Sequence, residues 1–176
     1  SYPMLLNGEP PIAPSAVYSR YSKAMPREMT LEDIERVQEA FVSAAARAQE
    51  AGFDGVEILG SGGYLITQFL STFKNHRTDD YGGSFENRVR FAREVLKAVR
   101  RGAGPDLAVG MRMSGEENNH DGLDDSECLQ IAQALAKEGA LDYLNVTAGT
   151  SAGLAGSIHI VPAMTFETGY TAPLAA

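Results

Sequence analysis

Apolar residues recur every three or four positions in three stretches of the chain, which predicts three amphipathic helices. Each stretch follows a residue whose side chain can accept a hydrogen bond from a free backbone N–H group, namely Thr30, Ser84 or Asp124. Glycines mark the expected ends, because glycine readily takes the left-handed conformation of a C-terminal cap. The sequence therefore predicts helices over residues 30–52, 84–102 and 124–139.

Short apolar runs lie before or after these helices, over residues 53–59, 107–113 and 141–146. Helices alternating with strands through short connections predict an α/β fold with parallel strands. In the second run the side chains alternate between the two faces of the sheet. The bulky odd-numbered residues suit packing against helices, and the small set that contains Gly110 and Arg112 suits a crowded interior.

The remaining segments lack a regular apolar period. Residues 1–29 contain several prolines, which fix φ and remove a hydrogen-bond donor, so an irregular arm is expected there. Residues 30–146 carry the βα units, and residues 147–176, rich in Gly, Ala and Thr, are expected to form a loop-rich tail with a short helix.

Composition excludes several classes of protein. The net charge of −8 and the absence of a basic patch argue against nucleic-acid binding. No apolar run approaches the roughly 18 residues that a membrane span needs, and the single Cys128 cannot form an internal disulfide. We expect a cytoplasmic protein without a membrane segment.

No metal site is expected either. The three histidines lie far apart and lack metal-ligand spacing. Glu116, Glu117 and Asp121 could suggest a loop for a hard cation, but acids solvated on the loop of residues 115–122 are the favoured interpretation.

The most informative stretch is residues 51–91, AGFDGVEILGSGGYLITQFLSTFKNHRTDDYGGSFENRVRF. It reads as a strand, a glycine cluster, a polar loop and a capped helix, and active sites of α/β enzymes lie at such strand ends. In the polar loop, Arg77 and Asp79 are suited to pair and stiffen the chain. The stretch resembles the old yellow enzyme family of NADH:flavin oxidoreductases, in the branch near 2,4-dienoyl-CoA reductase and trimethylamine dehydrogenase.

The resemblance implies part of a (β/α)8 TIM barrel, about its fourth to sixth βα units. A complete barrel needs about 200 to 250 residues, and three strands cannot close it, so we expect this chain to be a portion of a larger enzyme. The resemblance also implies FMN as cofactor and NADH or NADPH as reductant. In the family, flavin phosphate is held by loops after the seventh and eighth strands, so the isolated chain is expected to bind FMN poorly.

The resemblance assigns roles to three residues. Arg112 matches an arginine beside the flavin ring, although an ion pair with Glu57 is an alternative reading. Tyr64 matches the tyrosine that donates the proton completing reduction of a carbon–carbon double bond, and the alternative is a tyrosine that starts a short helix with its hydroxyl bonded to backbone. His159, after the third strand, is a candidate substrate contact.

Two positions depart from the family pattern. Many members carry His where this chain has Leu59, and His or Asn where it has Gly62; these donors hold the carbonyl oxygen of an unsaturated substrate. Neither residue has a side-chain donor here, which puts ordinary enone reduction in doubt. The dienoyl-CoA reductase branch also lacks the pair.

Two functions are therefore weighed. The first is an FMN-dependent oxidoreductase that passes hydride from NAD(P)H to a small, unsaturated organic acceptor, with this chain as part of the barrel. The second is a non-catalytic half-barrel that associates with the rest of the barrel or with a second copy, because strand edges and one barrel face would be uncovered. A phosphate-binding aldolase or isomerase barrel is a weaker third reading.

Overall fold

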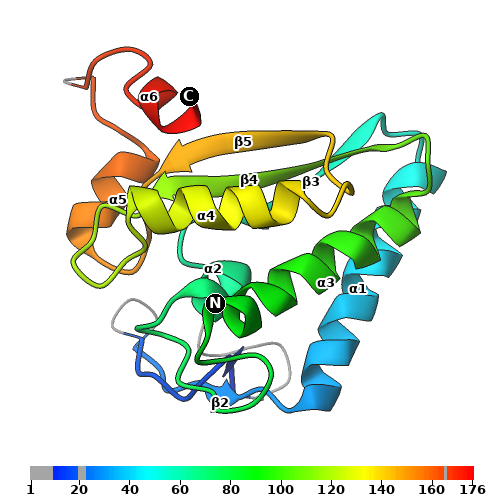
Figure 1. Cartoon of the computed structure of the whole chain (residues 1–176), viewed down its shortest axis with the longest axis horizontal. Coiled ribbons are helices and arrows are strands. Elements are labelled where there is room, and N and C mark those ends of the chain that lie inside the picture. Colours follow the sequence, from blue (N-terminus) through cyan, green and yellow to red (C-terminus); the bar gives the residue numbers. More distant parts are fainter. Residues whose placement is uncertain (1–9, 20–22, 165) are drawn as a thin grey trace.

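A three-stranded parallel sheet organises the molecule, in a computed structural model that describes residues 10–19, 23–164 and 166–176. Its strands are β3 (Gly55–Gly60), β4 (Ala108–Glu116) and β5 (Tyr143–Ala148), in that order. Helices α3 (Phe85–Ala103) and α4 (Asp125–Ala136) connect successive strands (Figure 1). The predicted α/β fold with parallel strands is confirmed, and the sheet does not close into a barrel.

Local capping explains where the helices begin. Helix α1 (Leu31–Glu50) starts after Thr30, whose hydroxyl accepts from the Asp33 N–H group while the Asp33 carboxylate accepts from the Thr30 N–H group. Ser84 and Asp124 cap α3 and α4 by accepting one hydrogen bond each, from the N–H group three residues later. The three predicted starts are therefore confirmed.

The helix ends differ from the prediction in two places. Gly102 does not end α3, which continues to Ala103 and is capped at Gly104 with φ of 69°. Gly102 serves a different purpose: a Cβ atom there would lie 2.4 Å from the Val42 carbonyl oxygen, so its absence lets α1 and α3 approach closely. Helix α4 ends at Ala136, before Gly139.

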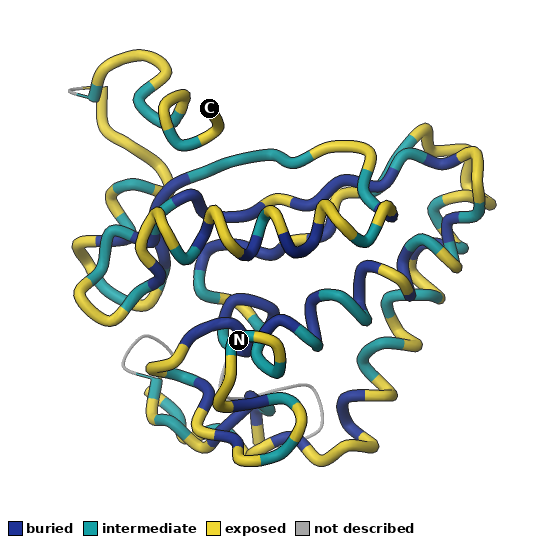
Figure 2. Tube along the Cα trace, viewed as in Figure 1, coloured by how far each residue is buried: buried dark blue, intermediate teal, exposed yellow. Residues whose placement is uncertain are grey.

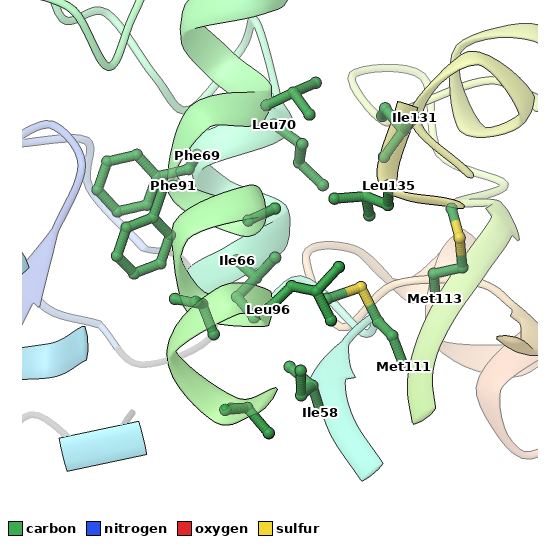
Figure 3. Packing of buried hydrophobic residues seen from close by; sticks show 14 of the residues in the cluster. Ile58, Ile66, Phe69, Leu70, Phe91, Leu96, Met111, Met113, Ile131 and Leu135 are labelled. Carbon is green, nitrogen blue, oxygen red and sulfur yellow. The ribbon is translucent and has the colours of Figure 1, made fainter. Parts of the chain in front are cut away.

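Helices α1, α3 and α4 lie together on one side of the sheet, and α3 is the most deeply buried of the three (Figures 1 and 2). The odd-numbered residues of β4 face them, as predicted: Val109, Met111 and Met113 are buried. Phe69 stacks on Phe91 with ring centroids 4.1 Å apart. Figure 3 shows how these side chains join with those of α4 into one core.

The opposite face of the sheet is open. Parallel register places Glu57, Gly110 and Tyr143 in one row and Leu59, Arg112 and Asn145 in the next, because paired residues point the same way. Leu59 is 47% and Tyr143 is 44% exposed. This is the face that would line the interior of a closed barrel, and we call it the inner face.

Short elements occupy the segments predicted to be irregular. Strands β1 (Ile12–Ala13) and β2 (Arg27–Glu28) pair in parallel within the arm, helix α2 (Leu65–Leu70) follows the glycine cluster, and α5 (Leu154–Ile160) and α6 (Ala172–Ala175) form in the tail. None of the helices in the described ranges has the length and apolar character needed to cross a membrane.

Candidate functional site

The loops after β3 and β5 meet at the carboxyl ends of the strands. The Gly62 carbonyl oxygen accepts hydrogen bonds from the Ser151 backbone N–H group at 3.1 Å and from the Ser151 hydroxyl at 2.6 Å. Gly63 has φ of 80°, and a Cβ atom there would lie 2.7 Å from the Thr150 hydroxyl oxygen. The glycine cluster therefore supplies the positive φ and the close approach that join the two loops.

A cavity of about 560 Å³ lies beside this junction. The arm forms one wall, which is largely apolar and includes Ile12 and Val17. The loops after the strands and helix α2 form the other wall, which is mostly polar and includes Tyr64, Thr67 and Glu117. A cavity of this size, with an apolar wall and converging polar groups, is typical of a site for a small organic ligand.

Arg77 holds the arm over the cavity. Its side chain is 5% exposed and donates to the carbonyl oxygens of Pro14 at 3.1 Å and Met29 at 2.6 Å. It also forms a two-point pair with Asp79, whose pKa is lowered by the hydrogen bond from Arg77. The His76 N–H group adds a bond to the Ser15 hydroxyl. The predicted stiffening pair therefore forms, and it also reaches the arm.

Tyr64 lies at the start of α2 and lines the cavity, with half of its surface exposed. Its ring packs against Gly62, where a Cβ atom would come within 3.3 Å of the ring. The short helix that the alternative reading expected does form. However, no hydrogen bond of the Tyr64 hydroxyl is found among the described residues, so its proton is available to a ligand.

Arg112 lies on the inner face, in register with Leu59, which precedes Tyr64 by five residues. The alternative ion pair with Glu57 does not form between these two described residues, because Glu57 Oε2 accepts from Asn145 Nδ2 at 3.0 Å instead. Within the described part of the chain, the exposed Arg112 guanidinium has neither an ion pair nor a hydrogen bond. Arg112 and Tyr64 thus belong to the same end of the sheet, but Arg112 does not line the cavity.

His159 lies on α5, away from the cavity walls. Its ring meets Phe166 edge-on, with centroids 5.2 Å apart, and Tyr170 donates a hydrogen bond to the His159 carbonyl oxygen. The structure therefore does not bring His159 together with Tyr64. Its role as a substrate contact stays a prediction.

Glu117 was expected to be a solvated acid, and this expectation is wrong. Its side chain is buried, and Oε2 accepts from the Leu123 N–H group at 2.9 Å, which closes the loop over residues 117–123. Burial raises its pKa above the ordinary value. The run of polar residues around it gave no sign of this burial, because the bond to Leu123 forms only when the loop folds back.

Sequence reasoning also missed Thr67, which lies on the apolar helix α2. Its hydroxyl is buried, lines the cavity, and has no hydrogen-bond partner among the described residues. The Gly63 carbonyl oxygen accepts from Gln68 Nε2 and the Tyr64 carbonyl oxygen from the Gln68 N–H group, and the Thr67 hydroxyl bonds to neither of them. A threonine between Ile66 and Phe69 was the only sequence signal.

This arrangement combines three chemical capacities. Arg112, a cation on the inner face that has no partner among the described residues, can stabilise an electron-rich planar group. The Tyr64 phenol, which makes no hydrogen bond within the part of the chain that the structure describes, can donate a proton. A cavity shared with that phenol can hold an organic molecule.

Comparison with known proteins agrees with this description. Over 147 residues the chain is 42% identical to an NADH oxidase from Thermoanaerobacter brockii, an alignment that covers 84% of this chain and 22% of that protein. A structure of 2-naphthoyl-CoA reductase superposes with a TM-score of 0.75 and 37% identity, covering 83% of this chain and 22% of that one. Morphinone reductase bound to tetrahydroNAD gives a TM-score of 0.72 with 33% identity, covering 82% of this chain and 44% of that one.

The chain therefore spans less than half the length of these relatives, and its open sheet corresponds to part of their TIM barrel. Residues 4–154 match the NADH:flavin oxidoreductase / NADH oxidase family. This match covers most of the sequence, and it includes Tyr64 at the start of α2 and Arg112 on β4. The chain belongs to the NADH:flavin oxidoreductase / NADH oxidase family.

Proposed function

We propose that the whole protein is an FMN-dependent oxidoreductase that passes hydride from NADH or NADPH to an unsaturated organic acceptor, and that this chain forms part of its barrel. One observation carries the proposal: an arginine and a tyrosine hydroxyl that have no partner among the described residues belong to the same end of one parallel sheet. Family membership supports the cofactor and the reductant.

The residues of the inner face fit a flavin ring. Arg112 is exposed and unpaired within the described residues, and its neighbour on the same face, Gly110, carries no side chain. Leaving such a cation without a partner inside a closed barrel would be costly, so an electron-rich ring beside Arg112 would satisfy it. When bound, FMN supplies the hydride chemistry, and the protein supplies positioning and charge.

Tyr64 is proposed as the proton donor. A phenol is a suitable general acid when it lies close to the carbon that receives the proton. Its hydroxyl has no partner in the described part of the chain, about half of its surface is exposed, and it lines the cavity. The ring is held against Gly62, which restricts where the hydroxyl can point.

The acceptor would be held differently from an enone in many relatives. Leu59 and Gly62 provide no side-chain donor, and the Gly62 carbonyl oxygen is occupied by two bonds from Ser151. A carbonyl-polarising pair is thus missing at these positions. We propose that the acceptor is oriented by the cavity beside Tyr64 instead.

The test is Tyr64→Phe in the full-length protein, with stopped-flow measurement of both half-reactions. Flavin reduction by NADPH should keep its rate, because the tyrosine proton is not used there. Reoxidation by an alkene acceptor should slow by about 100-fold, as expected for loss of a general acid. Tyr81→Phe is the control, because the Tyr81 hydroxyl bonds to Glu94 and the residue does not line the cavity. Equal slowing of both half-reactions, or normal reoxidation, would contradict the role of Tyr64.

A second candidate function is assembly without catalysis, in which this chain pairs with a second copy. It is favoured by the exposed Leu59 and Tyr143 on the inner face and by the outer edges of β3 and β5, which pair with no further strand in the described residues. Light scattering should then show an oligomer at micromolar concentration. A clean monomer would count against this candidate.

We also propose a cytoplasmic location. The buried Cys128 is a free thiol, which is usual in a reducing compartment. Cell fractionation followed by immunodetection tests this proposal, and recovery outside the cytoplasmic fraction would contradict it.

A further inference from the structure

We infer that Asn145 is a positioning residue: it holds the Glu57 carboxylate apart from Arg112 and thereby leaves the Arg112 guanidinium available to an electron-rich ring on the inner face. The consequence for a flavin rests on the proposed function, whereas the hold on Glu57 does not. The three residues come from three neighbouring strands, β5, β3 and β4.

The register of the sheet brings Glu57 close to Arg112. Arg112 lies in one row with Leu59 and Asn145, and Glu57 lies in the row before it, beside Gly110. Glu57 and Arg112 are therefore diagonal neighbours on adjacent strands, at a spacing of about 7 Å that long side chains can bridge. Opposite charges attract one another at such a spacing, so an ion pair between the two is the expected arrangement.

That ion pair does not form, because Glu57 is held from the other side. Asn145 Nδ2 donates to Glu57 Oε2 at 3.0 Å, although β4 lies between their two strands. Within the described ranges, Arg112 makes neither an ion pair nor a hydrogen bond. The carboxylate that Arg112 could have taken is thus bound to an amide on β5.

Gly110 makes this contact across β4 possible. The backbones of β3 and β5 are about 10 Å apart, which is two strand spacings. A side chain on Gly110 would stand between them, and the space is taken instead by side chains of β5. A Cβ atom on Gly110 would lie 2.1 Å from Cζ of Tyr143, so this ring leans over β4 toward β3. Asn145 and Tyr143 therefore both reach across the glycine.

Tyr143 locates the carboxylate independently. Partial loss of water raises the pKa of Tyr143 above its ordinary value, and the negative charge of Glu57 raises it further. A charge influences a phenol in this way only when the two lie close together. The Glu57 carboxylate is therefore drawn over Gly110 toward β5.

A neutral amide is suited to this hold. An ionised carboxylate has only acceptors, so Asn145 must offer its NH2 group to Glu57. A lysine at position 145 would add a second cation to the inner face. An apolar residue there would release Glu57 to Arg112. Asn145 fixes the carboxylate without changing the charge of the face.

The consequence concerns the reduction potential of a flavin beside Arg112. A guanidinium without a carboxylate partner favours the electron-rich reduced ring, whereas an ion pair presents almost no net charge to it. By preventing the ion pair, Asn145 raises the potential. The Glu57 charge remains on the same face, but it does not contact the guanidinium.

The first test needs no flavin. In the present chain, NMR measures how fast the Arg112 Nε–H proton exchanges with water. Asn145→Leu should let Glu57 pair with Arg112 and slow this exchange about threefold, the value of an exposed ion pair. The double variant Asn145→Leu, Glu57→Gln is the matched control. It should exchange at the parent rate, because no carboxylate is left to pair.

The second test measures the flavin potential of the full-length protein by titration against a reference redox dye. Asn145→Leu should lower the equilibrium constant for flavin reduction about tenfold, on the scale of one partly screened charge. This is about 30 mV for a two-electron couple. In the Glu57→Gln background, Asn145→Leu should leave the potential unchanged. Asn145→Ala should give the same two results, so the test stands even if the leucine variant does not fold.

The outcomes separate this inference from the proposed function. Unchanged Arg112 exchange in Asn145→Leu, or slowing that persists when Glu57 is also replaced, would overturn the inference. So would a rise in potential, or a fall of equal size with and without Glu57. Slower exchange together with an unchanged potential would leave the hold on Glu57 standing. It would show that no flavin lies beside Arg112, and would count against the proposed function instead.

Discussion

Gly102→Ala should lower the free energy of unfolding more than Gly110→Ala does, although the added Cβ atom would lie nearer to a neighbouring atom at Gly110. A Cβ atom on Gly102 would lie 2.4 Å from the Val42 carbonyl oxygen and 3.0 Å from its carbonyl carbon. A Cβ atom on Gly110 would come nearer still to a neighbour, 2.1 Å from the Tyr143 ring. The first neighbour is helix backbone, and the second is the end of a half-exposed side chain.

The magnitude for Gly102→Ala follows from the packing of α1 against α3. The Val42 carbonyl cannot move alone, so the helices must separate by about 1 Å to restore van der Waals contact. Overpacking of this kind costs about 3 kcal/mol at its upper end, and alanine regains about 1 kcal/mol of helix propensity. The expected net loss in free energy of unfolding is about 2 kcal/mol.

Gly110→Ala should cost less. The Tyr143 ring can turn toward open solvent on the inner face, since 44% of the residue is exposed. The expected loss is therefore less than about 1 kcal/mol, below the usual cost of overpacking, because a movable ring relieves the overlap.

Urea denaturation of both variants, followed by circular dichroism, measures the two free energies. Gly110→Ala serves as the matched control for Gly102→Ala, because the same methyl group is added next to a movable neighbour. The reasoning is refuted if Gly102→Ala is neutral, or if Gly110→Ala is the more destabilising of the two.

Three further predictions concern the arm, the first helix and the cofactor. Arg77→Met should lower the free energy of unfolding by about 3 kcal/mol, because buried hydrogen bonds to two carbonyl oxygens are lost. Limited proteolysis should then cut the arm faster than in the parent. An unchanged cleavage rate would contradict the role of Arg77 in holding the arm. The hydrogen bond from Arg27 lowers the pKa of Asp33 below its ordinary 3.8. The ionised Asp33 carboxylate therefore stabilises the folded chain above about pH 4, and this contribution is lost as the pH falls through the lowered pKa. Asp33→Asn should therefore cost about 1 kcal/mol at pH 7 and less at pH 2 in denaturant titrations, and an equal cost at both would refute this. The purified chain should show no stoichiometric flavin absorbance near 450 nm, since the phosphate-binding loops expected in the family lie outside it; a stoichiometric yellow band from about 1 mol of FMN per chain would contradict this.

The helix starts could be predicted because capping is local. Thr30, Ser84 and Asp124 each bond to an N–H group three residues away, so a few neighbouring residues contain the whole signal. The direction in which the β4 side chains point could be predicted as well, because alternation along a strand is fixed by backbone geometry. The end of α3 was predicted wrongly because Gly102 is required by the close approach of Val42, which lies sixty residues earlier in the chain, and not by a helix cap.

Part of the candidate site could likewise be predicted from local sequence, and part could not. The motif from residue 51 to residue 91 was enough to indicate the family and to single out Tyr64, and the small face of β4 singled out Arg112. Only the tertiary structure showed that Glu117 is buried and that the Thr67 hydroxyl has no described partner. Burial depends on which distant segment covers a residue, and no local pattern contains that information.

The sequence by itself determined the order of the three main helices and the three main strands, the residues at which those helices start, and the direction in which the β4 side chains point. The tertiary structure decided that the arm closes a cavity over the strand ends, through Arg77 bonds to Pro14 and Met29. The physical reason is range: hydrogen bonds within a turn are set by neighbours, whereas a cavity exists only when segments some sixty residues apart pack against one another.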